Sequence, residues 1–196
     1  MTRHIVIIRH GNTFASSAEA RRIGARTDIP LTAEGRVQAE RLGAHLASLR
    51  LADCRLFSGP LVRARETAGH IAAALNLRDI AIAPWLDEVD HGPDEGMPEA
   101  DVAARLGTEA LGDWDERGVA PPGWIVDRDA RLAAWQRFFR EAREGADLLV
   151  TSNGAARFAL LAAGLGNGAL KLRTGAFGCL TVRDGAISLA GWDERP

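Results

Sequence analysis

Three residues suited to phosphate chemistry follow directly on the first apolar run of the chain. The run covers residues 5–8, and Arg9-His10-Gly11 comes after it. A neutral imidazole can attack phosphorus, and a planar guanidinium spreads the charge of a phosphate dianion over paired hydrogen bonds. The pair therefore predicts phosphoryl transfer, with His10 as the nucleophile and Arg9 as a phosphate ligand. The alternative is a surface histidine or a metal ligand, which also commonly follows a strand.

The next positions would complete a phosphate-binding loop. Gly11 has no side chain to obstruct an incoming phosphate, and Asn12 and Thr13 offer neutral hydrogen-bond donors. We therefore expect Gly11, Asn12 and Thr13 to bind substrate beside the nucleophile.

Two later segments also place polar residues after an apolar run. Arg63 lies in the segment 58–64, where Pro60 suits the first turn of a helix, and it would supply a second guanidinium. The alternative for Arg63 is an ordinary solvated arginine, as we expect for its neighbour Arg65. Asn153 and Gly154 follow the apolar segment 147–151 and open a helix, whose free N–H groups attract an anion.

The elements that must position these residues alternate between strands and helices. Unbroken apolar and β-branched residues predict a strand over 4–8 that is buried on both faces of a parallel sheet. Further strands are expected over 54–57, 80–83 and 147–151. Helices are expected over 33–49 with Thr32 as the cap, from Pro60 to Leu75, and along a stripe of Leu132, Trp135, Phe139 and Ala142.

The last part of the chain predicts a hairpin over 178–182 and 186–190, turning at Asp184-Gly185. The whole pattern predicts an α/β fold, a three-layer α/β/α sandwich with a mostly parallel central sheet. In such sheets, ligands bind outside the carboxyl ends of the strands. Because His10, Arg63 and Asn153 each follow a strand, we expect them to converge on one edge.

Several motifs occur in the order and at the spacings of a known family. They are Arg9-His10-Gly11, the segment 24–39 with Gly24, Asp28 and Pro30-Leu31-Thr32, the segment 58–64, and Leu86-Asp87-Glu88 followed by Gly92 and Glu95-Gly96. In these motifs, from residue 5 to about residue 157, the chain resembles the histidine phosphatase superfamily, in the branch of phosphoglycerate mutases and small phosphohydrolases.

The resemblance implies a phosphoglycerate mutase-like fold, a phosphohistidine intermediate at His10, and Glu88 as the proton donor. Crowding by Asp87, Asp90 and Asp94 would raise the pKa of Glu88, which suits a donor near neutrality. Glu95 is the second candidate for this role, and a solvated acidic loop is the alternative.

The chain departs from the family pattern at Asn153, which stands where the family carries a second histidine before a glycine. An amide donates a neutral hydrogen bond where an imidazolium donates a charged one, a difference of roughly 1–2 kcal/mol. Turnover would slow by about one or two orders of magnitude. The N–H of Gly154 would still serve the phosphate, and His91 is an alternative replacement for the missing histidine.

The segment 92–124 is long for a connection and contains a predicted helix over 99–111. Long structured insertions near strand ends often cover the site, so we expect a lid that sets substrate choice. In the alternative, Trp114 and Trp124 only pack the insertion against the core. The acidic residues of this segment argue against a highly anionic substrate.

Composition sets the remaining expectations. A chain of 196 residues that is 46% hydrophobic predicts one domain over 1–196. The net charge of −2 gives no support to a nucleic-acid or membrane partner. Cys54 and Cys179 have no spacing partner, and the N-terminal apolar run is too short for a signal peptide, so we expect a cytoplasmic protein. The oligomeric state is left open by the sequence.

The sequence therefore predicts a metal-independent phosphomonoester hydrolase that needs no cofactor and acts on a small phosphorylated metabolite. His10, Arg9, Arg63, Asn153 and Glu88 would carry the reaction. Two alternatives stay open, namely a phosphomutase and a protein that binds a phosphoryl ligand without turning it over.

Overall fold

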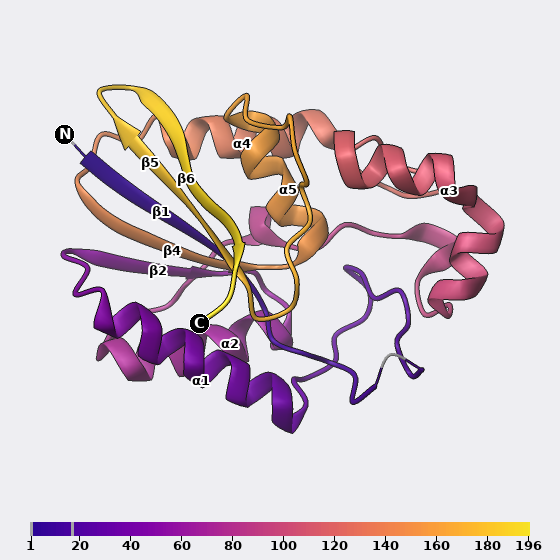
Figure 1. Ribbon diagram of the computed structural model, residues 1–196, viewed down its shortest axis with the longest axis horizontal. Helices are drawn as coiled ribbons and strands as arrows, with labels where there is room; N and C mark the ends of the chain where they lie inside the picture. Colours follow the sequence, from indigo (N-terminus) through magenta and orange to yellow (C-terminus); the bar gives the residue numbers. More distant parts are fainter. Residues whose placement is uncertain (1, 17) are drawn as a thin grey trace.

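The computed structural model describes residues 2–16 and 18–196, and these form a six-stranded sheet with the order β3-β2-β4-β1-β5-β6. Figure 1 shows this sheet between two layers of helices. The strands are β1 (Thr2–Arg9), β2 (Cys54–Ser58), β3 (Ala81–Ile82), β4 (Gly145–Thr151), β5 (Phe177–Arg183) and β6 (Ala186–Glu194). The predicted three-layer α/β/α fold is confirmed.

The sheet is parallel over β1 to β4 and antiparallel at one edge. Strand β4 pairs in parallel with both β1 and β2, and β3 pairs in parallel with β2. Strand β5 runs antiparallel to β1, and β6 antiparallel to β5, which is the predicted hairpin. The carboxyl ends of β1, β2 and β4 and the amino end of β5 therefore lie at the same edge.

Two hydrophobic cores lie on the two faces of the sheet. Helices α1 (Ala33–Ser48) and α2 (Val62–Leu75) cover one face, and α4 (Arg128–Phe139) and α5 (Asn153–Ala162) cover the other (Figure 1). On β1, Ile5 and Ile7 pack into the core beneath α4 and α5, whereas Val6 and Ile8 pack into the core beneath α1 and α2. Alternate side chains of a strand point to opposite faces, so an unbroken apolar run fills both cores.

Helix α4 ends earlier than its apolar stripe predicts, because Ala142 lies outside it. The helix ends at Phe139, and the guanidinium of Arg3 donates hydrogen bonds to carbonyl groups at and just beyond this end. It donates to Phe138 O at 2.7 Å and to Glu141 O at 3.3 Å. The last carbonyls of a helix have no partner within the helix, so a cation placed there stabilises the end.

Helix α2 begins at Val62, two residues after Pro60. The first N–H group of the helix finds its acceptor in a distant loop, since Val62 N donates to Asp28 Oδ1 at 2.6 Å. Strand β3 is also shorter than the predicted 80–83, with only Ala81 and Ile82 paired to β2. It is followed by the short helix η1 (Pro84–Leu86).

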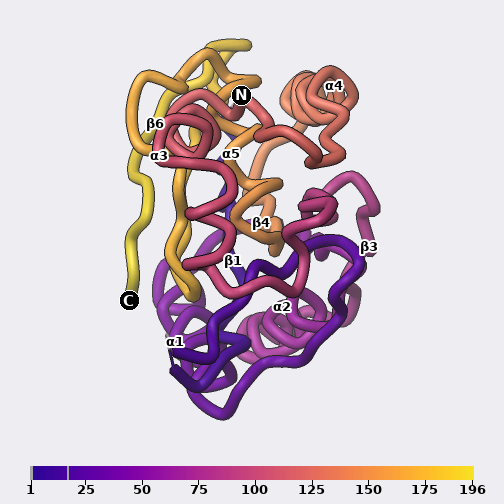
Figure 2. The backbone as a smooth tube through the Cα atoms, turned by 90° about the vertical axis from the view of Figure 1, so that its right-hand side faces the viewer, coloured from indigo at the N-terminus to yellow at the C-terminus, as the bar shows by residue number. Residues whose placement is uncertain are grey.

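The insertion between residues 92 and 124 contains η2 (Gly92–Asp94) and α3 (Glu99–Arg117), which continues past the predicted end at 111. Helix α3 is kinked at Gly107, where φ is +77°. It lies at the side of the molecule beyond the carboxyl ends of the strands, as Figure 2 shows. Trp114 and Trp124 are both buried in the core, with ring centroids 5.2 Å apart.

A buried arginine ties this insertion to α5. Arg157 is fully buried, its guanidinium lies 4.0 Å from the ring centroid of Trp114, and it donates to Trp114 O. The side chain of Arg157 therefore connects α5 to the second half of α3. In the described part of the chain, no helix is both long and apolar enough to cross a membrane.

Candidate active site

The candidate site lies at the edge where β1, β2 and β4 end. His10 N donates to Thr151 O at 3.0 Å, and Gly59 N donates to Val150 O at 2.9 Å. These bonds extend the parallel pairing by one residue and place the loops after the three strands side by side. Helices α2 and α5 then begin at this edge, so the predicted convergence of the three segments is what the fold produces.

The imidazole of His10 is held at both nitrogens. Its Nδ1 lies 2.8 Å from Gly11 O, and its Nε2 lies 3.2 Å from Arg63 Nε. A carbonyl oxygen only accepts and a guanidinium only donates, so Nδ1 carries the proton and Nε2 the lone pair. The free electron pair of His10 therefore faces Arg63.

The surroundings keep this imidazole neutral. Burial, and then the positive charges of Arg63 and Arg9, hold the pKa of His10 well below its ordinary value of 6.5. The His10 side chain is 2% exposed. A neutral imidazole with a fixed lone pair is the form that can act as a nucleophile.

Arg63 is fully buried and fixed by the loop that follows β1. Its Nη1 donates to Thr27 O at 2.6 Å, and its Nη2 donates to Gly24 O at 3.2 Å. A guanidinium has five N–H groups, so one remains on each terminal nitrogen for a ligand. The neighbouring Arg65 is exposed, as expected.

Arg9 is less tightly held and faces an open pocket. Its Nη1 donates to Leu172 O at 2.7 Å, and its Nε is buried without a partner among the described residues. Burial lowers the pKa of Arg9 to about 10, so it stays charged at neutral pH. The pocket has a volume of about 330 Å³. Its lining includes Arg9, Asn12, Thr13, Arg21, Glu99 and Thr174.

Gly11 has a different use from the expected one. A Cβ atom on Gly11 would lie 2.3 Å from Gly35 O, so the missing side chain lets the loop pack against the start of α1. The N–H of Gly11 donates to Thr67 Oγ1 at 3.2 Å.

Asn12 is fixed through its backbone N–H, which donates to Gln38 Oε1 at 2.9 Å, and its Oδ1 accepts from Thr174 Oγ1. Of the predicted binding loop, Asn12 and Thr13 line the pocket.

Glu88 is buried against the start of α5. Its Oε2 accepts from Gly154 N at 3.1 Å, and its Oε1 accepts from Val89 N at 2.8 Å. A Cβ atom on Gly154 would lie 2.1 Å from Glu88 Oε1, so only glycine allows the carboxylate to come this close. The N–H of Gly154, expected to serve the phosphate, is therefore used by Glu88.

The expected rise in the pKa of Glu88 is wrong. Burial raises the pKa, but His91, Arg63 and the N–H groups of Val89 and Gly154 outweigh burial and hold it below 4.5. Two of the three neighbouring carboxylates are paired elsewhere. Asp94 binds Arg105 and Trp124 Nε1, and Asp90 lies 3.1 Å from Arg26 Nε.

Asp87 is held close to Glu88, since its Oδ1 accepts from the backbone N–H of Glu88 at 2.8 Å, and burial together with the negative charge of Glu88 raises the pKa of Asp87. Glu95, the second candidate for proton donor, is also fixed by a partner. Its Oε1 accepts from Thr27 Oγ1 at 2.7 Å.

The family model of the histidine phosphatase superfamily, branch 1, matches residues 5–194 of the chain. This protein is a histidine phosphatase superfamily member. The 2,3-bisphosphoglycerate-dependent phosphoglycerate mutase 2 of Gloeobacter violaceus is 28% identical over 158 residues, covering 76% of this chain and 70% of the mutase.

Two solved structures of phosphatases share the fold. A mycobacterial glucosyl-3-phosphoglycerate phosphatase matches with a TM-score of 0.78 at 20% identity, covering 97% of this chain and 98% of the other. A phosphoserine phosphatase from Entamoeba histolytica matches with a TM-score of 0.76 at 17% identity, covering 98% of this chain and 97% of the other. The proteins that this chain is similar to therefore include both phosphatases and a mutase.

Asn153 is the first residue of α5, and its side chain has a definite orientation. Its Oδ1 accepts from Leu172 N at 2.8 Å. Because a backbone N–H can only donate, the amide nitrogen Nδ2 must point the other way and is available as a donor. The carbonyl of the same Leu172 accepts from Arg9. The backbone N–H and carbonyl of Leu172 therefore link Asn153 to Arg9.

Leu172 and Thr174 belong to a loop from which sequence reasoning selected no residue. The predicted terminal hairpin could have pointed to this loop. Strand β5 runs antiparallel to β1, so it starts where the parallel strands end, and the loop that precedes it must lie at the ligand-binding edge.

His91 is buried beside Glu88, not exposed on a loop. It is 4% exposed, and its ring centroid lies 4.3 Å from that of Trp124. Burial lowers the pKa of His91 to about 4, so the ring is neutral at neutral pH. Among the described residues, His, Cys, Asp and Glu side chains form no group of three placed to hold a metal ion.

Proposed function

We propose that this superfamily member hydrolyses a phosphomonoester of a small metabolite through a phosphohistidine at His10, without a metal ion. The observation that carries the proposal is the double fixation of His10, with Nδ1 donating to Gly11 O and the lone pair of Nε2 facing Arg63. A neutral imidazole beside buried Arg63 and half-buried Arg9 is suited to attack the phosphorus of an anion that these arginines would hold.

In the first step, the phosphoryl group lies between Arg9, Arg63 and the Nδ2 of Asn153. Their N–H groups bind the non-bridging oxygens and neutralise the charge. The 3.2 Å contact between Arg63 Nε and His10 Nε2 is long for a hydrogen bond, and we expect Arg63 to exchange it for a phosphate oxygen. Nε2 then forms a bond to phosphorus as the ester P–O bond breaks.

The leaving oxygen needs a proton, and Glu88 is the buried acid beside the start of α5. Its pKa below 4.5 means that it is ionised before substrate binds. A phosphate dianion placed nearby opposes a second negative charge, so Glu88 takes up a proton on binding and delivers it to the leaving oxygen. In the second step, water attacks phosphorus, gives a proton to Glu88 and releases phosphate and neutral His10.

The mutase alternative is supported by the relatives that carry that name. A mutase must return the phosphoryl group from His10 to another oxygen of the bound product before water attacks. The two activities are separated by supplying 3-phosphoglycerate with a trace of 2,3-bisphosphoglycerate. A mutase makes 2-phosphoglycerate without net release of phosphate, and a phosphatase releases phosphate.

The decisive experiment is a screen of phosphorylated metabolites with phosphate release as the readout, comparing wild type with His10→Ala. We expect release by wild type and a loss of at least a thousandfold in the variant, as is typical when a nucleophile is removed. Rapid quench at alkaline pH with labelled substrate should trap label on His10.

Two controls complete this experiment. Treatment with a chelator should leave the rate unchanged, because guanidinium groups neutralise the charge. Equal rates for wild type and His10→Ala would overturn the nucleophile assignment. Substrate binding by a wild type that releases no phosphate would support the binding-only alternative.

A further inference from the structure

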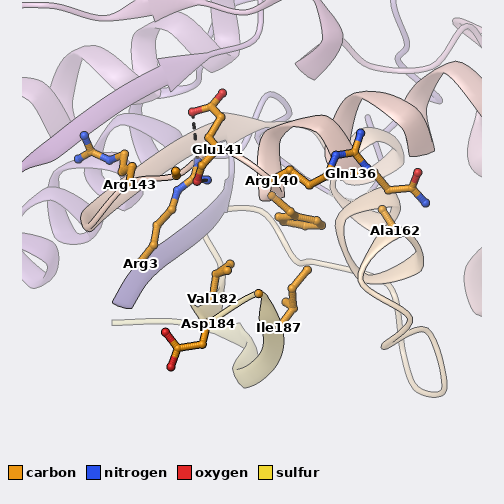
Figure 3. Close-up of a pocket in the computed structure, with 12 residues that line it drawn as sticks. Arg3, Gln136, Arg140, Glu141, Arg143, Ala162, Val182, Asp184 and Ile187 are labelled. Carbon is orange, nitrogen blue, oxygen red and sulfur yellow. Dashed lines mark hydrogen bonds and ion pairs between the residues drawn. The ribbon is translucent and has the colours of Figure 1, made fainter. Parts of the chain in front are cut away.

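A second cavity lies at the opposite edge of the sheet, where β1 begins. Its volume is about 620 Å³. Figure 3 shows its walls, formed by the start of β1, the end of α4, the end of α5 and the β5–β6 turn. No residue lines both this cavity and the pocket beside Arg9. Strand β1 runs between them, with Arg3 near one end and Arg9 at the other.

The floor and one side of this cavity are apolar. Phe139 from α4, Ala162 from α5, and Val182 and Ile187 from the hairpin contribute to the lining. Val182 and Ile187 are paired neighbours on β5 and β6 and lie together in Figure 3. An apolar lining of this extent fits the body of a small molecule, because binding removes apolar surface on both sides from water.

The rest of the lining is charged and includes a buried donor without an acceptor. Arg3 is 1% exposed, and its Nη2 donates no hydrogen bond to any described residue. Glu141 Oε2 lies 3.7 Å from this nitrogen, which is beyond hydrogen-bond distance. A buried N–H without an acceptor is unfavourable, so an acceptor delivered by a ligand would be bound strongly.

Positive charge outnumbers negative charge around this donor. Asp147 is fully buried and is shared by Arg3, Arg55 and Arg143. Glu141 is the second carboxylate of this group, so three guanidinium groups share two carboxylates. Arg140 adds a further cation to the rim, opposite Asp184 of the turn. Guanidinium groups therefore outnumber carboxylates in these ion pairs of Arg3, Arg55 and Arg143, which favours an anionic ligand.

We propose that this cavity is a binding site for a small amphipathic anion, in which Arg3 Nη2 and Arg140 bind a single carboxylate or sulfonate and the apolar wall holds a hydrocarbon or aryl body. The site is separate from the phosphate chemistry at the other edge. Its ligand differs from a phosphomonoester, because only one anionic group is matched and most of the binding surface is apolar.

The test is a titration of the full chain with 1-anilinonaphthalene-8-sulfonate, whose fluorescence rises when its aryl body leaves water. Decanoate and decan-1-ol are then used to displace it. We expect one dye per chain, and displacement by decanoate at a concentration at least tenfold lower than by decan-1-ol. Equal displacement by the neutral alcohol would overturn the assignment of an anion site.

Matched variants locate the dye. Ala162→Phe fills this cavity and should abolish binding, whereas Ala169→Phe, in a different apolar hollow lined by Leu189 and Trp192, should leave it intact. The reverse pattern, or unchanged binding by both, would overturn the location. Thermal unfolding of each variant shows whether it is folded.

A pair of surface charge variants keeps the test decisive if Ala162→Phe fails to fold. Arg140→Glu should weaken dye and decanoate binding at least tenfold. Arg137→Glu, an exposed change on the same helix outside the cavity, should change neither by more than twofold. Equal weakening by the two variants would mean that the effect is one of net charge and would overturn the site. Cosedimentation with phosphatidylglycerol vesicles that Arg140→Glu abolishes would identify a lipid surface as the source of the anion and would overturn the small-molecule proposal.

Discussion

The side-chain oxygen of Asn153 accepts a hydrogen bond from the backbone N–H of Leu172 at 2.8 Å. This bond does two things for the candidate site. It turns the amide nitrogen of Asn153 away from the loop, and it helps to hold the residue whose carbonyl binds Arg9 at 2.7 Å. In the proposed mechanism, Asn153 would therefore donate to the phosphate and also support the loop that holds Arg9.

A substitution series at position 153 separates the two roles. Asn153→Ala removes both and should lower kcat/KM by about tenfold or more, since each neutral hydrogen bond contributes about 1 kcal/mol. Asn153→Asp keeps the acceptor for Leu172 but repels the phosphate, so it should fall below Asn153→Ala. Steady-state kinetics on the best substrate of the screen is the measurement. An Asp variant as active as wild type would mean that the residue serves only the loop.

The reciprocal change, Asn153→His, should raise phosphate release by roughly 10- to 100-fold. A protonated imidazole donates to the phosphate through Nε2–H as a charged donor, which is stronger than an amide by about 1–2 kcal/mol, and its Nδ1–H then gives up the acceptor that Asn153 offers to Leu172 N. If wild type and His10→Ala both release no phosphate, and Asn153→His releases none either, the chain binds its ligand without turnover.

Gly154→Ala should reproduce the loss of Glu88. The added methyl would lie 2.1 Å from Glu88 Oε1 and 3.0 Å from a methyl group of Val89, so the carboxylate must leave its place. We expect a fall in alkyl phosphate hydrolysis close to that of Glu88→Gln, and a destabilisation of about 1–3 kcal/mol.

A double-mutant cycle with Glu88→Gln checks this prediction. The two losses should not add, because both remove the same group from the same place. Gly69→Ala on α2 is the matched control, since an added methyl there has no atom within 4 Å. Additive losses would show that Gly154 acts through something other than Glu88.

Stability should fall as the pH drops below 6.5, in part because of His91. In the folded chain, burial holds the pKa of His91 at about 4, against 6.5 in the unfolded chain. Between pH 4 and pH 6.5, His91 is therefore protonated in the unfolded chain but neutral in the folded chain. The free energy of unfolding therefore decreases by up to about 3 kcal/mol as the pH falls from 6.5 to 4. The groups that face the ring are Glu88, Glu95, Arg22 and Arg157.

Urea unfolding at pH 7 and pH 4.5 measures this effect. His91→Gln should lose less stability between the two pH values than wild type, while exposed His4→Gln controls for a histidine substitution elsewhere. The difference between the two pH values is compared, so a constant cost of removing His91 from its contact with Trp124 cancels. An identical pH dependence in wild type and His91→Gln would contradict the assignment.

Much of the fold follows from local patterns. The unbroken run of residues 5–8 predicted a strand that is buried on both faces, and Thr32 caps α1 by accepting from Gly35 N as expected. The end of α4 was not predictable in this way. Ala142 continues the apolar spacing, yet the helix ends at Phe139, where a guanidinium from β1, more than a hundred residues away in sequence, binds Phe138 O in the last turn and Glu141 O just beyond it.

The electrostatics of the site were the least predictable part. Glu88 has three acidic neighbours in sequence, which suggested repulsion. In the folded chain Asp94 is paired with Arg105 and Asp90 with Arg26, whereas Glu88 meets two backbone N–H groups. A pKa depends on partners brought by the tertiary structure, and sequence neighbours say little about them. The sequence patterns predicted which segments meet at this edge of the sheet, but not the ionisation of Glu88.

The importance of Glu88 should depend on the leaving group. An alkoxide leaves with great difficulty unless it is protonated, whereas p-nitrophenolate is stable as an anion. Glu88→Gln should therefore lower the hydrolysis of an alkyl phosphate by roughly 10²–10⁴ and that of p-nitrophenyl phosphate far less. Because the Glu88 carboxylate is ionised in the free chain, binding of the alkyl phosphate should also take up about one proton, measurable by calorimetry in buffers of different ionisation enthalpy. The Gln variant should show no such uptake. Equal losses on the two esters would mean that Glu88 positions substrate instead, and a normal alkyl phosphate rate in the variant would move the proton donor to Glu95 or His91.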